Sequence, residues 1–172
     1  MRWTEAASLL AFALLTGACS TAPVRIPAES VDELAAPARA IPGCAALGSF
    51  VDARPNAELG TLGAREFVFE DYPGWLRRQL ERRLAGDGPP VRIELLRAYL
   101  ETNRSTLSFT VVLRSQVRGQ PPRVHRGSDT RINWFNSNGE LGSFVERASE
   151  QAIKQLVAQA DAACAATAPG ME

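Results

Sequence analysis

Residues 107–114 read Leu-Ser-Phe-Thr-Val-Val-Leu-Arg, and their alternation is the strongest indication of the fold class. Four apolar side chains take every second position: Leu107, Phe109, Val111 and Leu113. The residues between them include Ser108, Thr110 and Arg114. A period of two predicts a β-strand with one buried face and one wet face. One-sided burial is typical of an antiparallel sheet that is covered on a single side.

Strand patterns also lie on both sides of this stretch. Residues 91–95 alternate in the same way, and residues 123–134 form a more polar strand with Val124 and Ile132 near its ends. Polar or Gly-Pro segments at 101–105 and 119–122 separate the three strands. The sequence therefore predicts an antiparallel meander of three strands.

Two amphipathic helices are expected around the meander. The first begins after Asp71, a good N-cap residue, and has Pro73 in its first turn. Its apolar stripe consists of Trp75, Leu76, Leu80 and Leu84. The second runs from about Leu141 to Ala163 at helical spacing. Its apolar stripe consists of Leu141, Phe144, Val145, Ala148, Ala152, Leu156, Val157 and Ala160.

Two further strands are predicted at residues 47–52 and 65–69, so the order is β-β-α-β-β-β-α. This order predicts an α+β fold with a largely antiparallel sheet of about four to five strands. Both helices then pack on one face of the sheet, because that arrangement buries both apolar stripes.

The first residues have the features of an export signal. Arg2 supplies a positive charge, residues 6–15 form a short apolar run, and Gly17 and Ala18 precede Cys19. The run is too short to span a bilayer, which needs about 20 apolar residues. The Leu-Thr-Gly-Ala-Cys ending resembles the lipobox of bacterial lipoproteins, which implies cleavage after residue 18 and acylation of Cys19. Ser20 follows the cysteine, and by the same resemblance this implies the outer membrane. The alternative is an ordinary secretory signal with an incidental cysteine.

The remaining chain divides into three parts. Residues 19–43 are rich in proline and alanine, and we expect a lipidated N-terminus followed by a tether that spans about 25–30 Å. Residues 44–166 are expected to form one α+β domain, and residues 167–172 a short tail.

Two cysteines remain if Cys19 carries lipid. Cys44 precedes the first predicted strand, and Cys164 ends the last predicted helix. An oxidising compartment permits a disulfide between them. That bond would close a loop of about 120 residues and contribute about 4–5 kcal/mol in the chain-entropy model. The alternative is two separate thiols, and in both cases the role is structural.

A family resemblance follows from the order of these features. The chain has a lipobox signal, an Asp-x-Arg segment at Asp52 and Arg54, a Leu59-Gly60 pair, and then helix, three strands and a long helix. It looks like the YajG-type lipoproteins and is similar in outline to the PqiC-type auxiliary lipoproteins, over about residues 44–164. The first resemblance implies no established activity. The second implies an outer-membrane accessory to phospholipid traffic that works within an assembly.

The composition of the chain, and the residues that could bind a metal or cofactor, narrow the possible classes of function. The chain has 19 basic and 19 acidic residues, so nothing favours a nucleic-acid partner. One histidine and no close group of carboxylates predict no metal site, and no cofactor motif is present. His125 lacks an accompanying catalytic signature, and we expect it on a polar strand surface. We expect Asp52 and Arg54 to bond each other or nearby backbone.

Two groups of side chains are candidate contacts for a partner or a lipid. Arg114, Arg118, Arg123 and Arg126 surround the turn at residues 118–122, where they are suited to acidic headgroups or lipid A phosphates. A solvated basic face is the alternative. Trp134 and Phe135 end the last predicted strand, where they either anchor a partner or cap the sheet.

Together these observations predict an accessory lipoprotein rather than an enzyme. We expect it to be anchored in the outer membrane by its N-terminal lipid, to face the periplasm, and to bind an envelope protein, a phospholipid or lipopolysaccharide. The alternatives are a periplasmic hydrolase that uses Asp52 or His125, and a purely structural envelope protein.

Overall fold

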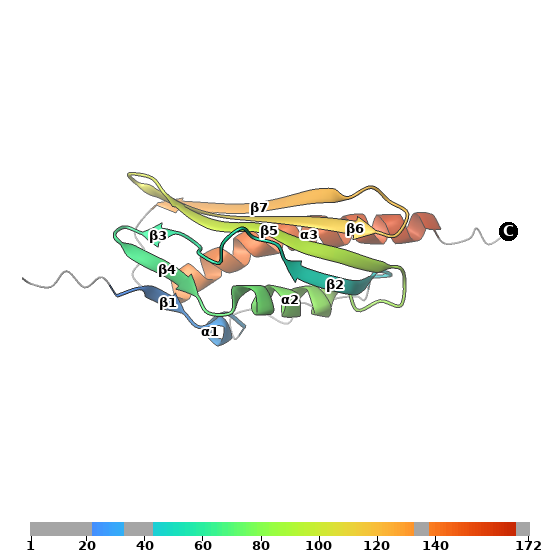
Figure 1. The fold of residues 1–172 in the computed structure, drawn as a ribbon, viewed down its shortest axis with the longest axis horizontal. Helices are drawn as coiled ribbons and strands as arrows, with labels where there is room; N and C mark the ends of the chain where they lie inside the picture. The colour runs from blue at the N-terminus through green and yellow to red at the C-terminus, as the bar shows by residue number, and fades with distance from the viewer. Residues whose placement is uncertain (1–21, 33–42, 133–137, 168–172) are drawn as a thin grey trace, which may run out of the picture.

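A computed structural model of the protein describes residues 22–32, 43–132 and 138–167, and it confirms the predicted α+β fold (Figure 1). Along the chain the elements are β1 (Val24–Ile26), α1 (Ala28–Asp32), β2 (Ala46–Asp52), β3 (Thr61–Leu62), β4 (Arg65–Phe69), α2 (Tyr72–Arg83), β5 (Pro90–Thr102), β6 (Thr106–Val117), β7 (Arg123–Ile132) and α3 (Asn138–Thr167). The predicted order is therefore kept, with β1, α1 and β3 added to it.

The larger sheet has four strands in the order β2-β5-β6-β7. As the meander predicts, β5 pairs with β6 and β6 with β7, both antiparallel. β2 adds to the other edge of β5 and runs parallel to it. The pairing of β5 with β6 shifts by one residue between Leu95 and Arg97, which is a β-bulge at Leu96. This bulge moves the side chains after it to the opposite face of the sheet.

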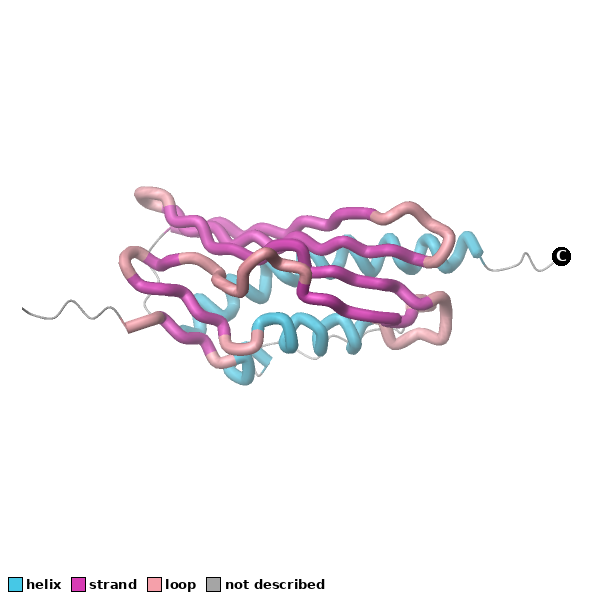
Figure 2. Tube along the Cα trace, viewed as in Figure 1, coloured by secondary structure: helices cyan, strands magenta, loops and turns pink. Residues whose placement is uncertain are grey.

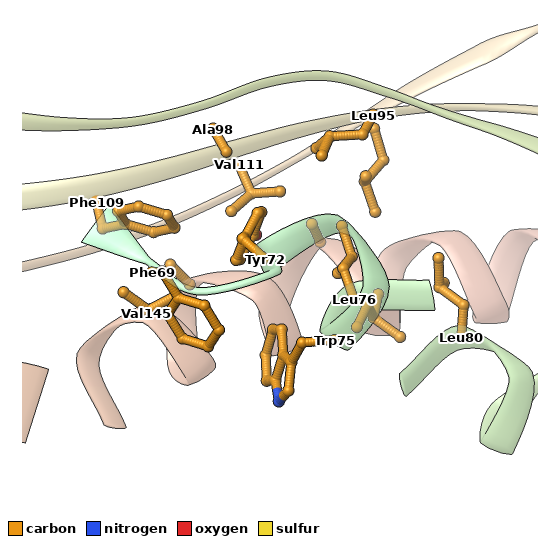
Figure 3. Packing of buried hydrophobic residues seen from close by; sticks show 14 of the residues in the cluster. Phe69, Tyr72, Trp75, Leu76, Leu80, Leu95, Ala98, Phe109, Val111 and Val145 are labelled. Carbon is orange, nitrogen blue, oxygen red and sulfur yellow. The ribbon is translucent and has the colours of Figure 1, made fainter. Parts of the chain in front are cut away.

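Helices α2 and α3 both lie on one face of this sheet (Figure 2). The apolar side chains of β6 point toward them, and Leu107, Phe109, Val111 and Leu113 are all fully buried. Aromatic rings fill the space between sheet and helices, with the rings of Tyr72 and Phe109 5.9 Å apart (Figure 3). Burial of this apolar face supplies most of the driving force for folding.

The backbones of the two layers approach closely at Gly127 of β7. A Cβ atom built there would overlap the backbone carbonyl oxygen of Ala148 in α3. Two glutamines of α3 also bond to the free edge of β7. The side chain of Gln151 accepts a hydrogen bond from Ser128 N–H at 2.9 Å, and that of Gln155 donates one to the Arg126 carbonyl at 3.1 Å. These bonds occupy edge groups that another strand would otherwise use.

The smaller sheet has three strands in the order β1-β4-β3, and it changes the predicted boundary of the domain. β1 pairs in parallel with β4, so that Val24 lies opposite Phe67 and Ile26 opposite Phe69. Val24, Ile26 and, in α1, Val31 belong to the hydrophobic core. This part of the predicted tether over residues 19–43 is therefore folded structure. Three residues between Pro23 and Pro27 are too few to show a strand period, so the sequence did not reveal it.

A disulfide joins Cys44 to Cys164, and their Cα atoms are 6.2 Å apart. It links the start of β2 to the last turns of α3. Since 120 residues separate the two cysteines in the sequence, the bond restricts most of the domain in its unfolded state.

We expect the paired change Cys44→Ala and Cys164→Ala to lower the free energy of unfolding by about 4–5 kcal/mol, because the unfolded chain gains loop entropy. Denaturant titration of the two proteins measures this difference. The unchanged protein with its disulfide reduced serves as the control and should match the variant. A loss below about 1 kcal/mol would show that the bond does not restrict the unfolded chain.

Candidate functional site

One face of the four-stranded sheet is covered by none of the described helices, and we call it the outer sheet face (Figure 2). Cross-strand pairing places its side chains in rows. One row contains Val51, Glu94, Arg114 and Val124, from four neighbouring strands. The next row contains Arg97, Val112 and Arg126. Residues far apart in the sequence thus form one continuous surface.

Positive charge dominates the middle of the outer sheet face. Arg92 and Arg114 both bind the carboxylate of Glu94, at 3.1 Å from Arg92 Nη2 and 2.8 Å from Arg114 Nε. One carboxylate between two guanidinium groups leaves a net positive charge. Arg97 and Arg126 add to it, because neither forms an ion pair with any described residue. Such a surface attracts an anionic partner.

The outer sheet face also carries exposed apolar side chains. Val51, Val124 and Ile132 are 43%, 63% and 67% exposed, and they are the large hydrophobic residues that stand out to solvent in the described chain. Arginine combined with exposed apolar area is typical of protein interfaces, where lysine is depleted. A depression of about 320 Å³ opens beside the charged side chains of this face. Its lining consists of Arg92, Glu94, Arg114, Ser115, Gln116 and Pro122.

The four arginines predicted as a cluster are divided by the structure. Arg114 and Arg126 lie on the outer sheet face, and Arg118 is exposed in the turn after β6. Arg123 pairs with Ser115, on the side of the sheet that faces α3. The predicted aromatic contacts Trp134 and Phe135 lie outside the described residues. Cys19 lies outside them as well.

Sequence reasoning missed two arginines of this surface. Arg92 alternates with Val91 and Ile93, so its outward position follows from the strand period alone. Simple alternation places Arg97 on the buried side, together with Leu95. The bulge at Leu96 reverses this placement, and nothing in the sequence marks the bulge.

His125 is buried rather than exposed, which corrects the expectation of a surface position. Its residue exposure is 5%, and it lies beneath α3. Its Nε2 is 2.8 Å from the Ser115 hydroxyl oxygen, and this hydroxyl donates to Gln159 Oε1 at 3.2 Å. Burial lowers the pKa of His125, the bond with Gln159 opposes this, and the charge of Arg123 adds to it. The ring is therefore neutral near pH 7.

The direction of these hydrogen bonds does not suit nucleophilic catalysis. A serine nucleophile donates its proton to histidine, whereas Ser115 donates to Gln159. Ser115 is only 2% exposed, so a substrate does not reach it. The side chains of His125, Ser115 and Gln159 instead form hydrogen bonds with one another between the sheet and α3, which is usual for buried polar groups.

Asp52 and Arg54 bond each other, as predicted. Arg54 Nε and Nη2 donate to the two carboxylate oxygens of Asp52, each at 2.8 Å, and Nη1 donates to the Ala57 carbonyl at 3.3 Å. The Arg54 side chain is 5% exposed and lies 6.0 Å from the ring centre of Tyr72. Its hydrogen bonds hold the pKa of Asp52 below the ordinary value, against the effect of partial burial. This pair fixes the loop between β2 and β3.

A depression of about 610 Å³ lies beside the Asp52–Arg54 pair. Charged residues of both signs line it: Arg25, Glu58, Glu66, Glu70 and Asp71. Among the described residues, no group of three or more histidine, cysteine, aspartate or glutamate side chains is placed to hold a metal ion. No helix in the described part of the chain is long and apolar enough to cross a membrane.

Comparison with known proteins gives similarity at the level of structure. The chain matches no known protein family, and no curated protein matches it. A crystal structure of a minor lipoprotein from Acinetobacter baumannii is similar, with 16% identity and a TM-score of 0.37, over 66% of this chain and 90% of that one. A likeness of this size does not define a shared function, and the resemblance to YajG-type and PqiC-type lipoproteins stays a prediction.

We expect the free energy of unfolding to fall as the pH is lowered from about 6.5. The unfolded chain protonates His125 near the ordinary pKa of 6.5, whereas the folded chain does so only at lower pH. Below this value the unfolded state therefore binds more protons. Denaturant titrations of the unchanged protein and of His125→Gln across this range test the point.

His125→Gln should show a weaker pH dependence, because His125 is the only histidine of the chain. Burial raises the pKa of Glu146, which gives a contribution of opposite sign that both proteins share. Equal pH dependence in the two proteins would contradict the burial of His125.

We expect Arg54→Met to lower the free energy of unfolding by about 1–2 kcal/mol, because it removes the charge-assisted hydrogen bonds from Arg54 to the partly exposed Asp52 carboxylate. Thermal and denaturant unfolding measure the loss. Arg77→Met is the matched control, since Arg77 and Glu81 form an exposed pair on α2, and it should change stability by less than about 0.5 kcal/mol. Equal effects of the two changes would refute a structural role of Arg54.

Proposed function

We propose that the protein is an accessory lipoprotein of the bacterial cell envelope that binds another envelope component through its outer sheet face. One observation carries the proposal: this face is free of the described helices and combines exposed valine side chains with arginines that form no ion pair with a described residue. Val124 lies opposite Arg114, in the row next to that of Arg97 and Arg126, so apolar area and positive charge adjoin on this face. The combination fits a docking surface.

The anchor in this proposal is the lipid on Cys19. It is supported by the positive start, the short apolar run and the small residues before the cysteine. Several acyl chains on one residue hold a protein on a bilayer far more firmly than one chain does. Ser20 after the cysteine favours the outer membrane, with the domain in the periplasm.

The partner that fits the outer sheet face is an acidic and partly apolar protein surface. Arg97 and Arg126 lie on either side of Val112 in one row, so a partner meets charge and apolar area together. A phospholipid or lipid A headgroup offers negative charge as well, and it is the alternative ligand. The PqiC-type resemblance favours a role as an auxiliary of lipid transport.

Two other functions are less well supported. A periplasmic hydrolase would use Asp52 or His125, but Asp52 is bound by Arg54 and His125 is buried. A purely structural envelope protein has no need of a bare, charged sheet face.

We expect the paired change Arg97→Gln and Arg126→Gln to weaken binding to the partner about tenfold or more, since interface arginines often contribute more than 1 kcal/mol each. The measurement is co-precipitation of the full-length, membrane-extracted protein with its partner from native envelopes, at low and high salt. The control is Arg77→Gln with Arg82→Gln, which removes the same charge from exposed positions on α2.

Three results of this experiment bear on the proposal. Loss of the partner in the outer-face variant alone supports it. Equal recovery of a partner by all three proteins would refute it. Recovery of phospholipid in place of protein, again lost in the outer-face variant, would assign the lipid alternative.

A further inference from the structure

The folded domain begins very close to the predicted lipid anchor. β1 starts at Val24, five residues after Cys19. Five residues of fully extended chain reach at most about 18 Å. Since β1 pairs with β4 and belongs to the core, the start of β1 cannot be far from the membrane surface once Cys19 is acylated. This step depends on the acylation in the proposed function.

The start of β1 lies at one end of the elongated molecule (Figure 1). The turn between β3 and β4 and the turn between β5 and β6 lie at the same end, as does the end of β7. The Thr102 hydroxyl donates a hydrogen bond to the Thr61 carbonyl at 3.0 Å, which ties β5 to β3 there. We call these parts, with Val24, the anchor end.

Charge distinguishes the anchor end from the helical side of the domain. Arg65 and Arg104 stand at its two turns, and neither forms an ion pair with any described residue. Arginines of α2 are instead neutralised: Arg77 contacts Glu81, Arg78 contacts Asp71 and Arg83 contacts Glu150. Free guanidinium groups attract anionic headgroups, while paired ones do so weakly.

An exposed apolar group lies at the same end. Ile132, at the end of β7, is 67% exposed. Glu66 and Glu101 are exposed on the neighbouring strands and offset part of this charge. Arg118 and Arg123 toward the opposite end form no ion pair with a described residue either, so the short link to Cys19 decides which end meets the membrane. Cationic turns beside an exposed aliphatic side chain suit the interface between headgroups and water.

We propose that the anchor end contacts the phospholipid headgroups and that the long axis of the domain is perpendicular to the membrane. β6 has 12 residues and extends away from this end, and at a rise of about 3.3 Å per residue it carries the Arg118 turn about 40 Å from the bilayer. The outer sheet face then points sideways into the periplasm. Arg118 and Arg123 are out of reach of the membrane that holds the lipid.

Fluorescence quenching in vesicles tests this orientation. Full-length, acylated protein is reconstituted into vesicles of phosphatidylethanolamine and phosphatidylglycerol that contain a phospholipid with a nitroxide headgroup. A fluorophore is attached at Ser105→Cys in the anchor end, or at Gln120→Cys or Asp87→Cys at the opposite end. We expect strong quenching of the fluorophore at Ser105→Cys. At the other two positions the fluorescence should be the same as in vesicles without the nitroxide lipid.

A second variant distinguishes the effect of the anchor-end arginines from the effect of the lipid tether. Arg65→Gln with Arg104→Gln should remove the increase in Ser105→Cys quenching that added phosphatidylglycerol produces. Arg77→Gln with Arg82→Gln, the matched control, should keep this increase. Equal loss in both pairs would refute the role of the anchor-end arginines.

Quenching at Gln120→Cys and Asp87→Cys without quenching at Ser105→Cys would mean that the domain is inverted. Similar quenching at all three positions would mean that the domain lies flat on the membrane, and either result overturns the orientation. Mass spectrometry of the N-terminal peptide is done on the same samples. A missing acyl mass would refute the proposed function itself, whereas an acylated protein without quenching at Ser105→Cys would refute only this inference.

Discussion

The structure depends on the contact between α3 and the four-stranded sheet. The 30 residues of α3 place an apolar stripe against β6 and β7, and Gly127 lets the helix backbone approach the strand more closely than any side chain would allow. The same contact buries the His125, Ser115 and Gln159 cluster and covers the edge of β7 with glutamine side chains. Because α2 and α3 both pack on one face of the sheet, the described helices leave the opposite face uncovered.

That asymmetry connects the fold to the proposed function. The covered face holds the core, and the outer sheet face holds Arg92, Arg97, Arg114 and Arg126 beside exposed aliphatic groups. The disulfide between Cys44 and Cys164 lies at the end of the molecule opposite to the anchor end, so the two constraints lie at the ends of the domain and leave the middle of the outer sheet face open. An anchored domain with a fixed, open sheet face is suited to present one surface to a partner.

Much of the fold was predictable from local pattern. The alternation from Leu107 to Leu113 and the helical spacing of the last helix each repeat often enough to define a period, and both are confirmed. Features without a repeating pattern were not predictable. The strand at Val24–Ile26 is too short to show a period of two, and no residue pattern indicates the bulge at Leu96. The same reason explains which residues of the candidate site could be predicted. Arg114 and Arg126 were identified, whereas Arg97 was missed because of the bulge, and His125 was placed on the wrong side because its strand is polar on both faces.

Photo-crosslinking in native envelopes tests whether the outer sheet face is the binding surface. A photoreactive amino acid is placed at Val124, which is 63% exposed on this face, or at Ala162, which is exposed on α3. We expect a discrete adduct with another envelope component from Val124 and none from Ala162. An adduct from Ala162 alone would contradict it.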